Sequence, residues 1–141
     1  MGRVAKFGVS QGRLVLPENG ELQSFPQSSW RKEFEIAGRV GLDFIELLVE
    51  REPNKSNPFW SLGGREEIRQ AASKNGTEIY SCCFDYVIDH DIANQNEAYR
   101  VELLDFFKAC EDLSISLIVL PLLEQSDLTK QTYKQYVPLI Q

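Results

Sequence analysis

The sequence predicts an α/β fold in which parallel strands alternate with helices, and three observations support this prediction. Four short apolar runs begin near Val4, Asp43, Thr77 and Ile115, which places their starts 34 to 39 residues apart. Segments with helical periodicity separate these runs, and a glycine closes two of the segments. Because strands that alternate with helices at this spacing form parallel sheets with right-handed crossovers, we expect about four βα units.

Size and composition limit the class of protein. The chain has 141 residues, of which 43% are hydrophobic and 26% charged, and its net charge is −6. These values are typical of one globular domain, which we place over residues 1–141. The sequence contains no apolar run of membrane-spanning length, and its opening MGRVAKFGVS lacks the apolar region of a signal peptide. An acidic chain without a basic cluster is also a poor binder of nucleic acid.

The four apolar runs are the expected strands. They read VAKFGVS, DFIELLV, TEIYSCCF and ISLIVLP in chain order. The last of them is apolar nearly throughout from Ile115 to Leu120. A continuous apolar run is typical of a parallel strand covered on both faces, so we expect this strand to be buried on both sides.

The segments between the strands have the apolar spacing of amphipathic helices. The positions with helical spacing are Trp30, Phe34, Ala37 and Gly41, and Ile68, Ala71, Ala72 and Asn75. In the last segment, Leu103, Phe106, Phe107, Cys110 and Leu113 form one apolar stripe. Gly41 and Gly76 follow the first two helical segments and precede strands directly. Glycine at this position is a common C-terminal cap, so we expect both helices to end there.

Chain length decides between two arrangements of these units. A closed (β/α)8 barrel typically needs about 250 residues, so four units form about half of one. A five-stranded doubly wound sheet also fits the length, but only Gly12 follows the first strand, without a glycine-rich phosphate turn. Near the C-terminus, Pro138 fits the first turn of a new helix. The chain would then stop inside an element, and we expect a fragment of a longer fold.

Three cysteines are present, at positions 82, 83 and 110. Adjacent strand residues face opposite sides of a sheet, so Cys82 and Cys83 suit burial and not a shared bridge. No CxxC pair indicates zinc or redox chemistry, and no base accompanies the thiols as a nucleophile would require. We expect reduced, buried thiols in a cytoplasmic protein.

Polar residues follow the predicted carboxyl ends of all four strands, where parallel α/β folds gather their functional groups. These residues are Gln11 and Arg13; Glu46, Glu50 and Arg51; Asp85, Tyr86, Asp89, His90 and Asp91; and Glu124, Gln125 and Ser126. Glu46 lies between Ile45 and Leu47 and should point to the opposite face, where a carboxylate has a functional role or a buried partner.

Other residues allow two interpretations each. Arg13 either binds a substrate oxygen or pairs with a surface acid. His90 is a loop residue or an acid whose flanking carboxylates favour its protonated form, while three adjacent residues rarely converge on one metal ion. The pair at 63–64 either exposes N–H groups to an anion or only permits a turn, and we favour the turn. Phe59 and Trp60 line a pocket or cover a helix, and we favour covering.

Four stretches in register resemble one family. SQGRL, GLDFIELLVE, SCCFDYVIDHDI and LIVLPLLEQSDL are similar to the corresponding segments of the sugar phosphate isomerase/epimerase family of xylose isomerase-like TIM barrels. The similarity covers most of residues 4–128. It implies a half barrel of TIM type that belongs to an enzyme moving a proton between neighbouring carbons of a sugar, sugar phosphate or polyol ketone.

The resemblance also implies that substrate binding and catalysis fall on different parts of the enzyme. In the complete family enzyme a divalent ion (Mn, Mg or Zn) is held by Glu, Asp, His and Glu from later strands, which this chain lacks. We therefore expect no catalytic residue and no bound metal here, and no epimerase turnover by the chain alone. The matching residues would form a substrate-binding wall, namely Gln11, Arg13, Glu46, Asp85, His90, Glu124, Gln125 and Ser126.

Two other functions follow from different features. Open barrel edges recruit partner strands, so a non-catalytic half barrel that self-associates as a homodimer and binds sugars or other proteins is the main alternative. Abasic-site endonuclease activity, known in the wider superfamily, is disfavoured by the charge of −6 and the missing basic groove.

Overall fold

A computed structural model describes residues 5–20, 24–91, 96–129, 133–136 and 138. Four parallel strands form one sheet in the order β1-β2-β3-β4. The strands are β1 (Gly8–Ser10), β2 (Phe44–Val49), β3 (Glu78–Phe84) and β4 (Leu117–Val119). The prediction of an α/β fold with a parallel sheet is confirmed, with β1 and β4 shorter than the apolar runs that predicted them.

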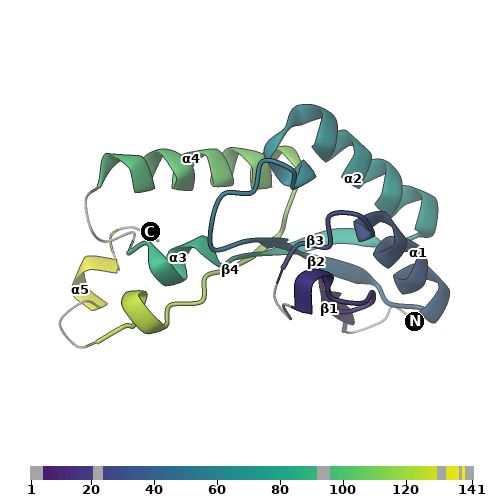
Figure 1. Ribbon diagram of the computed structural model, residues 1–141, viewed down its shortest axis with the longest axis horizontal. Coiled ribbons are helices and arrows are strands. Elements are labelled where there is room, and N and C mark those ends of the chain that lie inside the picture. The colour runs from purple at the N-terminus through teal and green to yellow at the C-terminus, as the bar shows by residue number, and fades with distance from the viewer. Residues whose placement is uncertain (1–4, 21–23, 92–95, 130–132, 137, 139–141) are drawn as a thin grey trace.

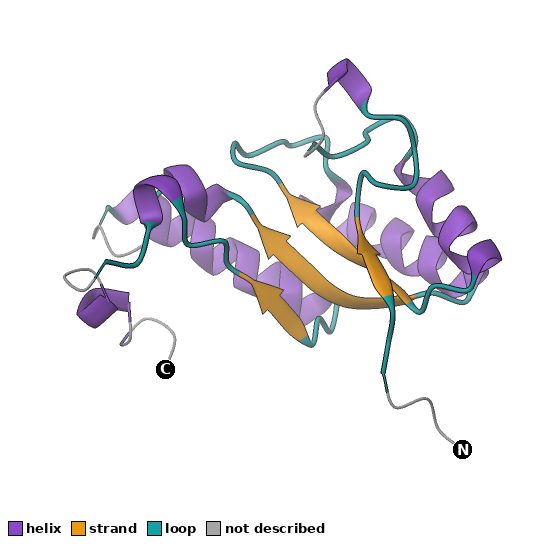
Figure 2. Cartoon of the chain, turned by 90° about the horizontal axis from the view of Figure 1, so that it is seen from below, coloured by secondary structure: helices purple, strands orange, loops and turns teal. Residues whose placement is uncertain are grey.

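Three long helices connect the strands and lie on the same face of the sheet (Figures 1 and 2). They are α1 (Trp30–Val40), α2 (Leu62–Asn75) and α4 (Glu97–Asp112). The shorter helices are η1 (Glu18–Gly20), η2 (Pro58–Trp60), α3 (Tyr86–Asp89), η3 (Glu124–Ser126) and α5 (Tyr133–Tyr136). We call the sheet face opposite α1, α2 and α4 the open face.

The predicted caps end two of the helices. Gly41 and Gly76 adopt left-handed conformations, with φ of 78° and 65°, and their N–H groups donate to carbonyls of the preceding turn. At the start of α2, the Ser61 hydroxyl accepts a hydrogen bond from the Gly64 N–H at 3.0 Å. Local sequence therefore sets where both helices end and where α2 begins.

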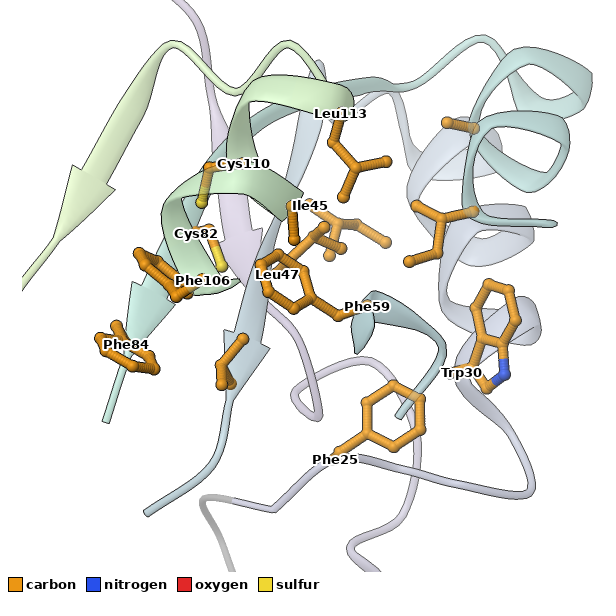
Figure 3. Close-up of a cluster of buried hydrophobic side chains, with 14 of the residues drawn as sticks. Phe25, Trp30, Ile45, Leu47, Phe59, Cys82, Phe84, Phe106, Cys110 and Leu113 are labelled. Atoms are coloured by element: carbon orange, nitrogen blue, oxygen red, sulfur yellow. The ribbon is translucent and has the colours of Figure 1, made fainter. Parts of the chain in front are cut away.

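The hydrophobic core fills the layer between the sheet and the three long helices (Figure 3). At its centre the ring of Phe106 from α4 stacks on Phe84 of β3, with centroids 3.9 Å apart, and on Phe59 of η2 at 5.5 Å. Phe59 thus packs on α4, which agrees with the interpretation that it covers a helix. The predicted stripe on α4 holds except at Phe107, which is 38% exposed.

The pairing of β2 with β3 contains a β-bulge near the middle of the two strands. Ile45 pairs with Ile79, and Leu47 pairs with Cys82, so Glu46 alone lies opposite both Tyr80 and Ser81. One extra residue in a strand locally shifts the alternation of side chains between the two faces. The bulge therefore brings Ser81 to the same face of the sheet as Glu46.

The expectation that the last strand is buried on both faces is wrong. β4 pairs only with β3 among the described residues, and Leu117 at its start is 49% exposed. Helices α1, α2 and α4 lie on one face of the sheet, and the described residues place no long helix on the other (Figure 2). The apolar run therefore predicts the strand, but it does not predict whether other elements cover its second face.

Two other expectations concern the chain ends and membranes. The helix predicted to begin at Pro138 falls on residues 137 and 139–141, which lie outside the described residues. Within the part that the structure describes, no helix has both the length and the apolar character needed to cross a membrane.

An ion-pair cluster joins α2 to the end of α4. Asp112 accepts from Arg65 Nε at 2.5 Å and lies 3.0 Å from Arg69 Nη2, while Arg65 Nη1 also donates to the Phe59 carbonyl at 2.9 Å. The hydrogen bond from Arg65 lowers the pKa of the Asp112 carboxyl group below its ordinary value. Because the folded state then binds this proton less readily than the unfolded state, the cluster stabilises the fold above the ordinary aspartate pKa.

Replacement of Asp112 by asparagine should therefore destabilise the protein at neutral pH and have little effect in acid. As the pH falls through the lowered pKa of Asp112, wild type loses this contribution and the two unfolding midpoints converge. Thermal unfolding followed by circular dichroism over a pH series measures this difference. The matched control is Asp105→Asn, which removes only an exposed pair with Lys108 at 3.2 Å. A difference that persists unchanged in acid would contradict the prediction.

Candidate functional site

Polar side chains gather at two places, one in the middle of the sheet and one at the carboxyl ends of the strands. Glu46, which was expected at the end of its strand, lies in the middle of β2. The first, which we call the Glu46 group, consists of Ser10, Glu46 and Ser81 on the open face. The second, the Arg51 group, consists of Arg51, Asp89 and Glu124 on the loops that follow β2, β3 and β4 (Figure 1). Parallel strands bring these loops to one edge of the sheet.

The Glu46 group spans three adjacent strands. Ser10 Oγ donates to Glu46 Oε1 at 3.2 Å, and Ser81 Oγ donates to Glu46 Oε2 at 3.0 Å. Ile45 and Leu47 belong to the core, so strand alternation turns Glu46 to the open face, as predicted. The carboxylate is half-buried and retains capacity to accept further hydrogen bonds, since each oxygen has two lone pairs.

Aromatic rings border the Glu46 group toward the amino ends of the strands. Phe44 and Tyr80 lie with ring centroids 5.1 Å apart, and Lys6 Nζ is 4.8 Å from the Tyr80 ring centroid. Lys6 also pairs with Glu78 at 2.5 Å. The open face therefore offers a carboxylate with two hydroxyl groups beside half-buried aromatic surface, a combination of apolar lining and a few polar groups common in ligand sites.

Arg51 joins three loops. Its Nη2 lies 2.8 Å from Glu124 Oε1, and its Nε lies 3.5 Å from Asp89 Oδ2. The side chains of Arg51, Asp89 and Glu124 are 42%, 29% and 55% exposed, so solvent reaches all three. Glu124 has a φ of 55°, in the left-handed region that few residues other than glycine adopt.

Glu33 fixes the first loop and was missed by sequence reasoning. This α1 residue is fully buried, and its Oε1 accepts from the N–H groups of Gly12 at 2.8 Å and Leu14 at 3.1 Å. Burial raises the pKa of its carboxyl group. The available signal was its position, because Glu33 falls on the buried stripe between Trp30 and Ala37. A charged residue on such a stripe requires a partner.

Three of the predicted wall residues are buried and bonded within the fold. Gln11 accepts from the Leu48 N–H at 3.1 Å through its side-chain oxygen. The Asp85 carboxylate accepts a hydrogen bond from Cys83 Sγ at 3.2 Å, and the Ser126 hydroxyl donates to the Leu123 carbonyl at 3.1 Å. These residues hold the loops at the carboxyl edge.

The remaining residues of the predicted substrate-binding wall differ in their exposure and in the groups that they contact. Arg13 and Gln125 are exposed, and Glu124 joins Arg51. His90 stacks on the Tyr86 ring with centroids 3.9 Å apart, and its Nδ1 lies 2.9 Å from the Tyr86 carbonyl oxygen. The acid interpretation of His90 relied on the flanking carboxylates of Asp89 and Asp91.

The carboxylate of Asp89 turns instead to Arg51, while His90 Nε2 lies 4.0 Å from Glu52 Oε1. Adjacent residues leave the backbone of the third loop in different directions, so nearness in the sequence does not bring these two side chains together.

The other motifs have structural roles. The Gly64 N–H is used by the Ser61 cap, which agrees with the turn interpretation of the glycine pair at 63–64. Cys82, Cys83 and Cys110 are free and buried, as predicted. Burial raises the pKa values of the Cys82 and Cys83 thiols, which keeps them protonated and unsuited to act as nucleophiles.

The described residues do not fit a metal centre. No group of three or more His, Cys, Asp or Glu side chains among residues 5–20, 24–91, 96–129 and 133–136 is placed to hold an ion. Comparison of the chain with protein-family models and with curated proteins finds no match. The functional interpretation therefore depends on the Glu46 and Arg51 groups themselves.

Proposed function

We propose that this chain is the N-terminal half of a (β/α) barrel of the sugar phosphate isomerase/epimerase kind. Its open face and carboxyl edge would bind one side of a sugar, sugar phosphate or polyol ketone. The observation that carries the proposal is the Glu46 group, where one carboxylate and two hydroxyl groups from three strands converge on the open face. Ser10 and Glu46 are half-buried there, and Ser81 is 1% exposed beneath them. The parallel sheet with the three long helices on one face supports the proposal, because this arrangement is compatible with half of a barrel.

The chemistry of the Glu46 group suits a polyhydroxylated ligand. Glu46 accepts hydrogen bonds only, whereas Ser10 and Ser81 both donate and accept. The serine O–H groups are donated to Glu46, so sugar hydroxyls can donate to the remaining lone pairs of Glu46 and of the serine oxygens. The rings of Phe44 and Tyr80 offer apolar surface to the C–H groups of the same ligand.

The proposal assigns binding to this chain, and proton transfer to groups outside it. The family that the sequence resembles uses a divalent ion, and the described residues do not fit such an ion. Glu46 accepts hydrogen bonds from both serines, and we assign it the role of hydrogen-bond acceptor for substrate hydroxyls.

The direct test is the affinity of the chain for a neutral ketose. We expect D-fructose to bind in the millimolar range and Glu46→Gln to weaken binding about tenfold, because a charge-assisted hydrogen bond is lost. Calorimetric titration measures both affinities. The control is Glu35→Gln on the exposed surface of α1, which makes the same charge change away from the site. Equal affinities for wild type and Glu46→Gln, or no binding, would contradict the proposal.

The alternative is a self-associating half barrel without catalytic function. Both edges of the sheet favour it, because β1 and β4 each pair with one strand among the described residues. Phe7 beside β1 is 60% exposed and Leu117 on β4 is 49% exposed. Unpaired strand edges invite a second chain. Light scattering, together with the sugar titration, distinguishes the proposed function from the alternative. A stable dimer without sugar affinity favours the alternative, and a monomer counts against it.

A further inference from the structure

We infer that the Arg51 group selects a neutral vicinal diol and rejects a phosphate monoester on this side of the site. The inference rests on the proposed function and narrows its substrate class to unphosphorylated sugars and polyol ketones. It depends on the arrangement of donors and acceptors at the carboxyl edge and on the charge of the loops there.

Arg51 places hydrogen-bond donors between two carboxylates from different loops. Its Nη2 lies 2.8 Å from Glu124 Oε1, while the longer 3.5 Å between Nε and Asp89 Oδ2 leaves the second contact looser. A hydroxyl group can accept from the guanidinium and donate to a carboxylate at once. Two neighbouring hydroxyls of a diol therefore match the alternating pattern of the Arg51 group, and the exposure of all three side chains lets a ligand reach them.

A phosphate monoester does not match this pattern. Its ionised oxygens accept hydrogen bonds and cannot donate to Asp89 or Glu124, which would face it as like charges. Arg51 already balances its charge against these two carboxylates. Phosphate sites normally present several donors without competing acids.

The negative charge of the surrounding loops also disfavours the binding of a phosphate monoester. The loops that follow β2, β3 and β4, over residues 50–57, 85–91 and 121–127, carry seven acidic residues and two basic ones. Asp85 is among the acidic residues and is 3% exposed beneath the edge. A site with a surplus of one sign lowers the local concentration of ligands that carry the same sign.

The position of Glu124 is set by the backbone and not only by its ion pair. Its φ of 55° orients the residue at the start of η3, and η3 packs against α3 of the third loop. The packing of η3 thus positions the Glu124 backbone, and the ion pair with Arg51 places its carboxylate beside the guanidinium, as expected for a preorganised specificity group.

The experiment compares D-fructose, its phosphate monoester and inorganic phosphate in titrations of the full chain followed by amide resonances. We expect the phosphate ester to bind at least about fivefold more weakly than D-fructose at low salt, and the difference to narrow as added salt screens the acidic loops. If the ester or inorganic phosphate binds as tightly as D-fructose, the inference is overturned while the proposed function stands. If neither sugar binds, both are overturned.

Variants assign the effect to the Arg51 group. Glu124→Gln should reduce the difference between the two sugars at least about threefold, because one repelling charge and one acceptor are removed. Asp89→Asn should act in the same direction and serves if the first variant folds poorly. Glu111→Gln, on the exposed end of α4 toward the amino edge of the sheet, is the matched control and should leave the difference unchanged. Equal discrimination in wild type, Glu124→Gln and Asp89→Asn would overturn the assignment.

Discussion

Replacement of Phe106 by alanine should lower the free energy of unfolding by about 3–5 kcal/mol. Phe106 is fully buried and lies between Phe84 and Phe59, with centroid distances of 3.9 and 5.5 Å. It therefore joins α4 to the sheet and to η2 through one stack of rings (Figure 3). Alanine would leave a cavity at the centre of this stack, and the surrounding rings are too large to close it.

Urea denaturation followed by circular dichroism measures this loss. The adjacent Phe107 provides the control, because it is 38% exposed and contributes less to the core. Phe107→Ala should cost less, about 1–2 kcal/mol, since more than a third of this residue's surface already faces solvent. Comparable losses for the two variants would contradict the packing described for α4.

The second large effect is expected at Gly64. A Cβ atom at this position would overlap the carbonyl oxygen of Pro58, so η2 and the first turn of α2 approach too closely for any side chain. Since the obstacle is backbone, it cannot rotate away. Gly64→Ala should therefore destabilise the fold by about 3 kcal/mol, at the upper end of usual overpacking costs.

Gly63 is the matched control for this prediction. A Cβ at Gly63 meets no atom within 4 Å, although the two glycines are adjacent in the same helical turn. Gly63→Ala should stabilise α2 by up to about 1 kcal/mol, because alanine loses less backbone entropy in a helix. Thermal unfolding of both variants checks the pair, and a neutral Gly64→Ala would contradict the close approach of η2 and α2.

The sequence was sufficient to predict the parts of the fold that local patterns encode. Gly41 and Gly76 end helices because their left-handed caps need glycine, and this requirement is visible in the sequence. The alternation of side chains along β2 correctly predicted that Glu46 points away from the core, to which Ile45 and Leu47 belong. Periodicity thus identifies which face a residue takes, together with the order of the elements.

What the sequence did not predict depends on contacts between distant segments. Glu33 binds the N–H groups of Gly12 and Leu14, and the two segments meet only after the chain has folded. The exposure of Leu117 also depends on what covers the second face of β4, which the apolar run does not encode.

The same limit applies to the candidate site. Arg51 was recognised as a residue at a strand end, but its joint contact with Asp89 and Glu124 requires three loops to converge. Gln11, Asp85 and Ser126 were expected at the ligand, whereas the structure shows their side chains bonded within the fold.

The measurement that tests the central claim most directly is the amide spectrum of the chain titrated with D-fructose. The proposed site predicts that the largest shifts fall on Ser10, Glu46 and Ser81 on the open face and on Arg51 at the carboxyl edge. Shifts confined to the exposed surfaces of α1, α2 and α4, or no shifts at all, would contradict the assignment of the open face as a sugar-binding wall.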